Sequence, residues 1–74
     1  MKETVLAILA DIRPEFDFTE EVDFIEQGML DSFDIVTLVS EIEEKCGVAI
    51  SGADIIPENF ASVDAIVDLI NKSK

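Results

Sequence analysis

Apolar residues recur in three separate stretches of the chain at the spacing of one face of an α-helix. The first stretch covers residues 2–13, where the apolar positions are Val5, Ile8, Leu9 and Ile12. Pro14 ends this helix, because proline lacks a backbone N–H and disfavours helical geometry at the residue before it.

The second stretch runs from Ser32 to Cys46, and its apolar stripe comprises Ile35, Leu38, Val39, Ile42 and Cys46. Gly47 ends this helix, because glycine tolerates the left-handed backbone of a helix C-terminus. A free cysteine on such a stripe behaves as a small apolar side chain, so we expect Cys46 to belong to the core.

The third stretch begins after Ser62, whose hydroxyl is suited to cap it, and continues to about residue 71. Its inner face is formed by Val63, Ile66, Val67 and Ile70. Together these patterns predict three main helices.

The segments between the second and third helices are short. Residues 48–50 alternate like a strand but have no strand to pair with, so we expect an extended connector that buries Val48 and Ile50. The sequence SGADIIP can form one short helical turn that Pro57 ends, and PENFAS is expected to be a loop.

A long segment, residues 14–31, separates the first two helices and has no clear apolar period. Among its acidic residues lie Phe16, Phe18, Phe24, Ile25, Met29 and Leu30. A loop of this length in a small domain is usually functional, and its aromatic residues indicate that it is pinned across the helices. Gly28 suggests a tight backbone turn just before the second helix.

The elements therefore predict an all-α fold. We expect a small bundle of three main helices plus one short helix, with a long loop between the first two helices. The length of 74 residues indicates a single domain, residues 1–74.

Charge narrows the range of partners. The chain has 17 acidic and 5 basic residues and a net charge of -12. Nucleic acids and anionic membrane surfaces are bound through Lys and Arg, so neither is expected as a partner. The charge favours partners with basic patches, although it also serves plain solubility.

The length of the apolar runs and the character of the first residues bear on where the protein is located. No run approaches the roughly 18 residues of a membrane span, so we expect no membrane insertion. The first residues are typical of an amphipathic helix rather than a signal peptide, and a lone cysteine rules out an internal disulfide framework. We expect a monomeric protein of the cytoplasm.

The residue types needed for most enzyme chemistry are missing. There is no histidine, one cysteine and no glycine-rich phosphate loop, so neither a Ser–His relay nor a zinc site can be built. The pairs Glu20–Glu21 and Glu43–Glu44 lack the ligand spacing of a calcium loop and are expected to be solvated charges. We expect no metal site and no catalytic activity.

The helix that begins at Ser32 has an unusual outward face. At about 100° per residue, Phe33 falls about 160° from Ile35 and points away from the core. The same outward half carries Thr37, Ser40 and Glu44, flanked by Val36 and Glu43 on one side and by Asp34 and Glu41 on the other. An apolar anchor among carboxylates fits a docking surface.

Ser32 stands at the start of this helix, where unpaired N–H groups and the helix dipole favour a negatively charged phosphate ester. The simpler interpretation is that Asp31 or Ser32 only caps the helix. An isolated Asp-Ser pair does not decide between these interpretations.

The sequence GMLDSFDIVTLVSEIEEKCGVAI resembles the core motif of the acyl carrier protein family, which includes the peptidyl and D-alanyl carrier proteins. In that family a glycine and apolar residues precede Asp-Ser, and a large apolar residue then opens an acidic helix. The resemblance extends over nearly the whole chain, with SVDAIVDLI as the last helix.

The resemblance implies that Ser32 carries covalent 4′-phosphopantetheine, attached by a phosphopantetheinyl transferase that uses coenzyme A. The thiol of this arm would hold acyl or aminoacyl groups as thioesters. Asp31 would help the transferase to recognise the site and place its Mg²⁺. The residues expected to contact partners are Phe33, Asp34, Val36, Thr37, Ser40, Glu43, Glu44 and Ile50.

The branch of the family stays open. Phe33 stands where leucine is usual, and Thr37 and Ser40 stand where fatty-acid carriers often have an acid and a large apolar residue. These departures count against a housekeeping fatty-acid role. IIPENFASVDAI looks more like discrete D-alanyl or aminoacyl carriers. The implied partners are acyl or aminoacyl ligases, synthases and acyltransferases with basic docking patches, in fatty-acid, polyketide, nonribosomal peptide or cell-wall acylation pathways.

An alternative needs no modification at all. A helical adaptor could bind a basic partner through the same acidic face, on charge and fold alone. It would differ from a carrier because replacing Ser32 would leave partner binding intact.

Overall fold

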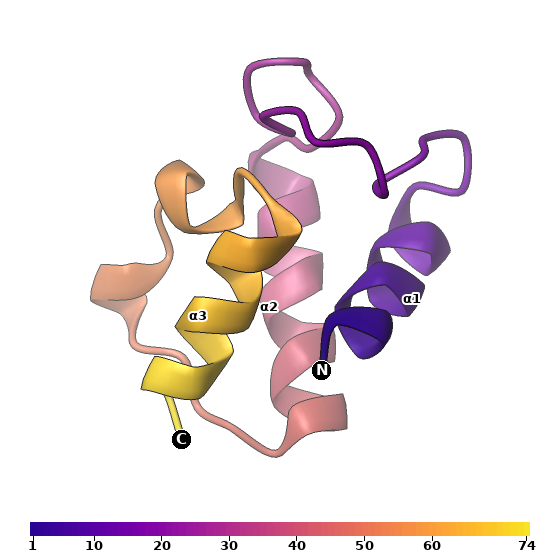
Figure 1. Ribbon diagram of the computed structural model, residues 1–74. Coiled ribbons are helices and arrows are strands. Elements are labelled where there is room, and N and C mark those ends of the chain that lie inside the picture. Colours follow the sequence, from indigo (N-terminus) through magenta and orange to yellow (C-terminus); the bar gives the residue numbers. More distant parts are fainter.

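Three α-helices build the protein, and they lie where the apolar pattern predicts them (Figure 1). The computed structural model describes all 74 residues. Helix α1 spans Lys2–Ile12, α2 spans Ser32–Cys46 and α3 spans Val63–Lys72. The chain contains no strand, so the prediction of an all-α bundle with a long first loop is confirmed. None of these helices has both the length and the apolar character needed to cross a membrane.

The ends of the helices follow the predicted caps. Gly47 adopts the left-handed conformation after α2, with φ 66° and ψ 35°. The Ser62 hydroxyl accepts a hydrogen bond from the backbone N–H of Ala65 at 3.1 Å and so caps α3. Helix α1 ends at Ile12, one residue earlier than predicted, with Arg13 as its C-cap.

The segment between α2 and α3 contains two short turns of 3₁₀-helix rather than one. The turn η1 spans Gly52–Asp54, and η2 spans Pro57–Phe60. The prediction of a loop from Pro57 onward was wrong, because proline's fixed φ suits the first position of a helical turn and the fully buried Phe60 anchors that turn. The Asn59 side chain donates to the carbonyl of Asp54 at 2.7 Å and ties the two turns together.

The core lies between the three helices and is entirely apolar. It includes Val5, Ile8 and Leu9 of α1, Ile35, Leu38, Val39 and Ile42 of α2, and Val63, Ile66, Leu69 and Ile70 of α3. Ile12, Cys46 and Val67 pack against this core and stay half-buried. On α3, Leu69 is buried, whereas Val67, which the sequence pattern assigned to the core, is only half-buried. The buried face of α3 is therefore rotated from the predicted one, because α3 packs against both α1 and η2.

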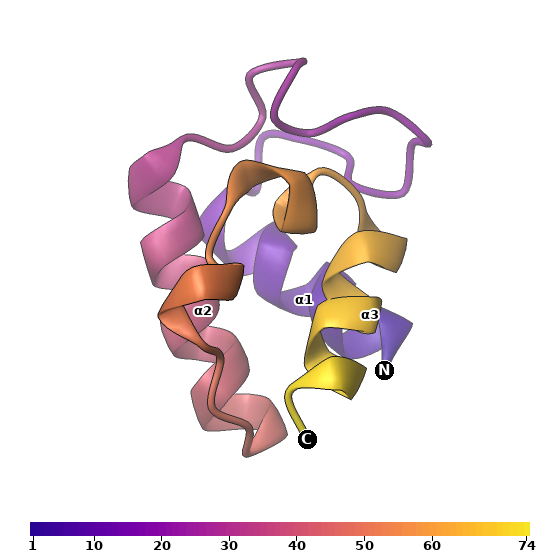
Figure 2. The ribbon, with the colours of Figure 1, turned by 90° about the vertical axis from the view of Figure 1, so that its left-hand side faces the viewer.

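The long loop is ordered, as predicted, and crosses the end of the bundle at which α2 begins (Figures 1 and 2). Its buried residues are Phe18, Phe24, Met29 and Leu30. The Phe18 and Phe24 rings meet edge to face, with centroids 5.0 Å apart. The backbone N–H of Phe24 donates to the carbonyl of Ala61 at 2.8 Å, and Gly28 makes the predicted turn with φ 72°. The loop therefore holds the start of α2 in place.

Candidate functional site

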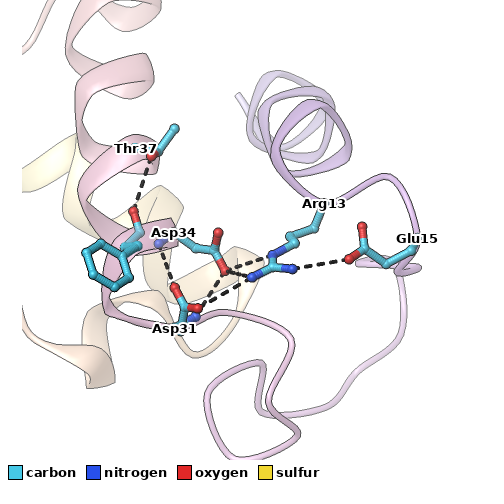
Figure 3. Close-up of polar contacts among 6 residues, drawn as sticks. Arg13, Glu15, Asp31, Asp34 and Thr37 are labelled. Atoms are coloured by element: carbon cyan, nitrogen blue, oxygen red, sulfur yellow. Dashed lines mark hydrogen bonds and ion pairs between the residues drawn. The ribbon is translucent and has the colours of Figure 1, made fainter.

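The N-terminus of α2 is capped by Asp31, which resolves the choice between Asp31 and Ser32 (Figure 3). The Asp31 carboxylate accepts a hydrogen bond from the backbone N–H of Asp34 at 2.9 Å. In return, the Asp34 carboxylate accepts from the backbone N–H of Asp31 at 3.1 Å. This reciprocal pair is a capping box, and it satisfies two backbone donors that a helix start otherwise leaves unpaired.

Ser32 is the first residue of α2 and is exposed to solvent. Because Asp31 makes the capping hydrogen bond, the helix does not need the Ser32 hydroxyl for this purpose. A phosphate ester on that hydroxyl would lie at the positive end of the helix dipole. The local structure therefore leaves the hydroxyl available for modification and favours the charge that modification brings.

Arg13 joins the end of α1 to this helix start, and sequence reasoning missed it. Its Nε donates to Asp34 Oδ2 at 2.8 Å, and one terminal nitrogen lies 2.8 Å from the same oxygen. Further contacts of 3.4 Å to Asp31 and 3.2 Å to Glu15 complete the group. Figure 3 shows the Arg13 guanidinium directed at the carboxylates of α2. The one signal in the sequence was that Arg13 is its only arginine.

The electrostatics of this group follow from its contacts. Partial burial raises the pKa of Asp34, but the hydrogen bonds from Arg13 and from the Asp31 N–H outweigh burial, so the pKa lies below its usual value. The hydrogen bond to Asp34, followed by that to Glu15, raises the pKa of Arg13. Both groups are therefore held in their charged forms beside Ser32.

An apolar patch lies on the outward side of α2, as the helix wheel predicts. Phe33 and Val36 are 82% and 65% exposed, and together they form an exposed apolar patch. Three further exposed residues of α2 share this side, namely Thr37, Ser40 and Glu44. The Thr37 hydroxyl donates to the backbone carbonyl of Phe33 at 3.2 Å (Figure 3). We call these five residues the α2 face.

The other three residues expected to contact partners are placed differently. Asp34 is engaged with Arg13 and only 13% of its side chain is exposed. Ile50 is 8% exposed and belongs to the core, as its place in the connector predicts. Glu43 is half-buried, and its carboxylate accepts a hydrogen bond from the N–H of Ile50 at 2.9 Å. Asp34 and Ile50 are thus largely buried in the free chain, and Glu43 has an internal partner. Contact of these three residues with partner enzymes stays a prediction.

A separate hollow of about 640 Å³ lies between α1, the long loop and the start of α3. The apolar residues among those that line it are Leu6, Phe18, Val22, Phe24, Ala61 and Val63. No residue of α2 contributes to it, so this hollow is distinct from the surroundings of Ser32.

Comparison with known protein families agrees with this geometry. The family model described as phosphopantetheine attachment site matches residues 3–70. Domains of this family carry 4′-phosphopantetheine covalently on a serine and are carriers rather than catalysts. Ser32 is exposed and its hydroxyl does not cap α2, which is compatible with attachment of such an arm. The match covers nearly the whole chain, and the chain therefore belongs to the phosphopantetheine attachment family of carrier domains.

Proposed function

We propose that Ser32 is the serine that bears the 4′-phosphopantetheine arm. The chain has five serines, and three of them have local structural tasks. Ser51 and Ser62 accept hydrogen bonds from backbone N–H groups at the starts of η1 and α3. The Ser73 hydroxyl donates to the carbonyl of Leu69 at 2.8 Å. Ser32 and Ser40 remain as exposed candidates.

Position along α2 separates these two candidates. Ser40 lies in the middle of the helix, where the backbone N–H groups are already paired within the helix. Ser32 lies at the N-terminus, where free N–H groups and the dipole stabilise a phosphodiester. The observation that carries the proposal is this exposed hydroxyl beside a cap made by its neighbour, Asp31.

The attachment step would use coenzyme A as donor and a phosphopantetheinyl transferase as catalyst. The Ser32 Oγ bonds to the phosphorus that carries the pantetheine group, and the bond from that phosphorus to adenosine 3′,5′-bisphosphate breaks. The leaving group takes the electron pair, and the hydroxyl proton passes to a base of the transferase or to solvent. Asp31 lies 3.4 Å from the Arg13 guanidinium, and under this proposal its carboxylate would be recognised by the transferase and its Mg²⁺.

The arm, once bound, would supply a thiol that holds acyl or aminoacyl groups as thioesters. The chain itself would present that cargo to partner enzymes through the α2 face. Phe33 and Val36 supply apolar anchors there, and Glu44 attracts partners with basic docking patches. The carrier would thus serve a ligase, synthase or acyltransferase by binding and presentation alone.

For the cargo, we propose acyl or aminoacyl intermediates of fatty-acid, polyketide, nonribosomal peptide or cell-wall acylation pathways. The small polar residues Thr37 and Ser40 on the α2 face favour a specialised carrier, such as a D-alanyl or aminoacyl carrier served by an adenylating ligase, over a housekeeping fatty-acid carrier. Loading assays with acyl and aminoacyl ligases would separate these branches.

Mass spectrometry tests the attachment site. Incubation with coenzyme A, Mg²⁺ and a broad-specificity transferase should add about 340 Da to the unmodified chain. Ser32→Ala should abolish the addition, and Ser40→Ala, which removes the other exposed hydroxyl of α2, should leave it intact. An unmodified native chain alongside a carrier that the same transferase does modify would refute the proposal and favour an acidic helical adaptor.

A further inference from the structure

Arg13 contacts the two acidic residues that flank Ser32. It lies at the C-cap of α1, whereas Asp31 and Asp34 lie at the start of α2, so the contact bridges the long loop. In Figure 3 its guanidinium lies between Glu15 on one side and the α2 carboxylates on the other. Arg13 is therefore the one side chain that links α1 to the capping box beside Ser32.

The two α2 carboxylates are held unequally. Asp34 Oδ2 receives Nε at 2.8 Å and a terminal nitrogen at 2.8 Å, whereas Asp31 Oδ2 lies 3.4 Å from the guanidinium. Two short charge-assisted contacts restrain a carboxylate strongly, whereas one long contact restrains it weakly. Asp34 is thus fixed, and the Asp31 oxygen remains accessible, with its side chain 57% exposed.

The Asp34 carboxylate is also half of the capping box. Because the same Oδ2 atom accepts from the Asp31 N–H at 3.1 Å, fixing Asp34 also fixes the backbone at Asp31. Ser32 follows directly, so the direction of its hydroxyl depends on this backbone. Loss of Arg13 would free the Asp34 carboxylate to leave the capping box. It would also remove the positive charge that offsets this carboxylate, at the place where the anionic coenzyme A must approach.

We propose that Arg13 is a positioning residue for the modification of Ser32, acting through Asp34 and the capping box. This inference rests on the proposed attachment at Ser32. It assigns Arg13 no contact with coenzyme A and no proton transfer. Its task is to hold the first turn of α2 and the Asp31 carboxylate in the arrangement that the transferase meets.

The test is the kinetics of phosphopantetheine transfer to the full chain, followed by mass spectrometry. Arg13→Gln should lower kcat/KM about tenfold to a hundredfold, mainly through kcat, because a misplaced nucleophile slows the step after binding. Arg13→Lys should recover part of the rate, since lysine keeps the charge but cannot make the two planar contacts. Arg13→Gln combined with Asp34→Asn should be no slower than Arg13→Gln alone, because both act through one contact.

Lys45→Gln is the matched control. Lys45 belongs to the last turn of α2 and forms ion pairs with Asp11 of α1 at 4.0 Å and with Glu41 of its own helix at 3.6 Å. Its replacement makes the same change in net charge. This variant should be modified at the native rate. Amide hydrogen exchange at Asp31, whose N–H donates to the Asp34 carboxylate, should accelerate in Arg13→Gln and stay unchanged in Lys45→Gln. This measurement reports the loosened cap without any transferase.

The outcomes separate the two proposals. A native chain that is not modified overturns both. If the native chain is modified and Arg13→Gln folds and is modified at the same rate, the role of Arg13 is overturned while the attachment at Ser32 stands. The role of Arg13 is also overturned if Lys45→Gln slows the transfer as much as Arg13→Gln does. If Arg13→Gln does not fold, Arg13→Lys decides: a several-fold lower kcat supports the role, and the native kcat overturns it.

Discussion

The carboxylate of Glu43 accepts a hydrogen bond from the backbone N–H of Ile50 at 2.9 Å and so connects the last turns of α2 to the connector that follows it. The contact spans Gly47, where the chain reverses direction in a left-handed conformation. Ile50 is buried, so its N–H has poor access to water and depends on this acceptor. Glu43 therefore acts first on the fold, although its position on the helix wheel suggested a surface role.

This contact leads to a stability prediction. Glu43→Ala should lower the free energy of unfolding by about 1–2 kcal/mol, because it leaves a buried N–H without an acceptor. Glu44→Ala removes the same charge from an exposed neighbour and should stay within about 0.5 kcal/mol of the native protein. Urea unfolding of both variants checks this, and equal stability of the two would contradict it.

A second prediction separates docking from packing. Phe33→Ala should change the free energy of unfolding by no more than about 0.5 kcal/mol, because Phe33 is 82% exposed. It should slow processing by partner enzymes at least about tenfold, since a central apolar anchor is lost. Phe24→Ala, at a residue that is 1% exposed, should instead cost about 3–5 kcal/mol of stability. A large loss of stability in Phe33→Ala would show that Phe33 packs against the fold.

The ion pair of Asp34 predicts a dependence on pH. The pKa of Asp34 is lower in the folded chain than in the unfolded chain, where it is about 3.9. The ionised carboxylate therefore stabilises the fold at pH values above the unfolded pKa. This stabilisation is lost as the pH falls through the lower pKa of the folded chain. Asp34→Asn should therefore destabilise the protein at pH 7, and the difference from the native chain should shrink below about pH 4. Taking this difference cancels the contribution of Asp17, whose pKa is also lowered, chiefly by its hydrogen bond from the Thr19 hydroxyl.

The backbone at Gly47 gives a fourth prediction. Gly47→Ala should cost about 1–2 kcal/mol, because an L-residue is strained at φ 66°, even though no atom lies within 4 Å of the added Cβ. Gly52→Ala is the control, since that glycine has equal space and no positive φ, and it should be neutral or slightly stabilising. Thermal unfolding of the pair distinguishes backbone strain from lost space, and equal midpoints would refute the strain argument.

Local rules were sufficient for most of the fold. The periods of 3.6 residues predicted all three helices, and Pro14, Gly47 and Ser62 marked three of their ends because each acts within one turn of the backbone. Leu69 and the turn at Pro57 were missed, because they depend on how α3 packs against α1 and on the burial of Phe60. The apolar pattern of one helix carries no information about which other segments it packs against, so these two features could not be predicted from it.

The site divides along the same line. Ser32 and Phe33 were placed correctly as exposed residues, since the start of a helix and its wheel are local properties. Arg13 was missed because its partner Asp34 is 21 residues away along the chain, and nothing in either segment alone indicates the pairing. Asp34 itself was read as a surface acid for the same reason.

The capping of α2 by Asp31 rather than by Ser32 bears on the order in which partner enzymes bind such a carrier. Because the cap does not use the Ser32 oxygen, attachment of an arm there would not require the first turn of α2, or the α2 face, to change. An enzyme that gripped only this face would hold empty, loaded and unloaded chains equally well, and equal affinity selects none of them. Under the proposed attachment, we therefore expect the order in which successive enzymes bind the carrier to depend on the group held at the far end of the arm.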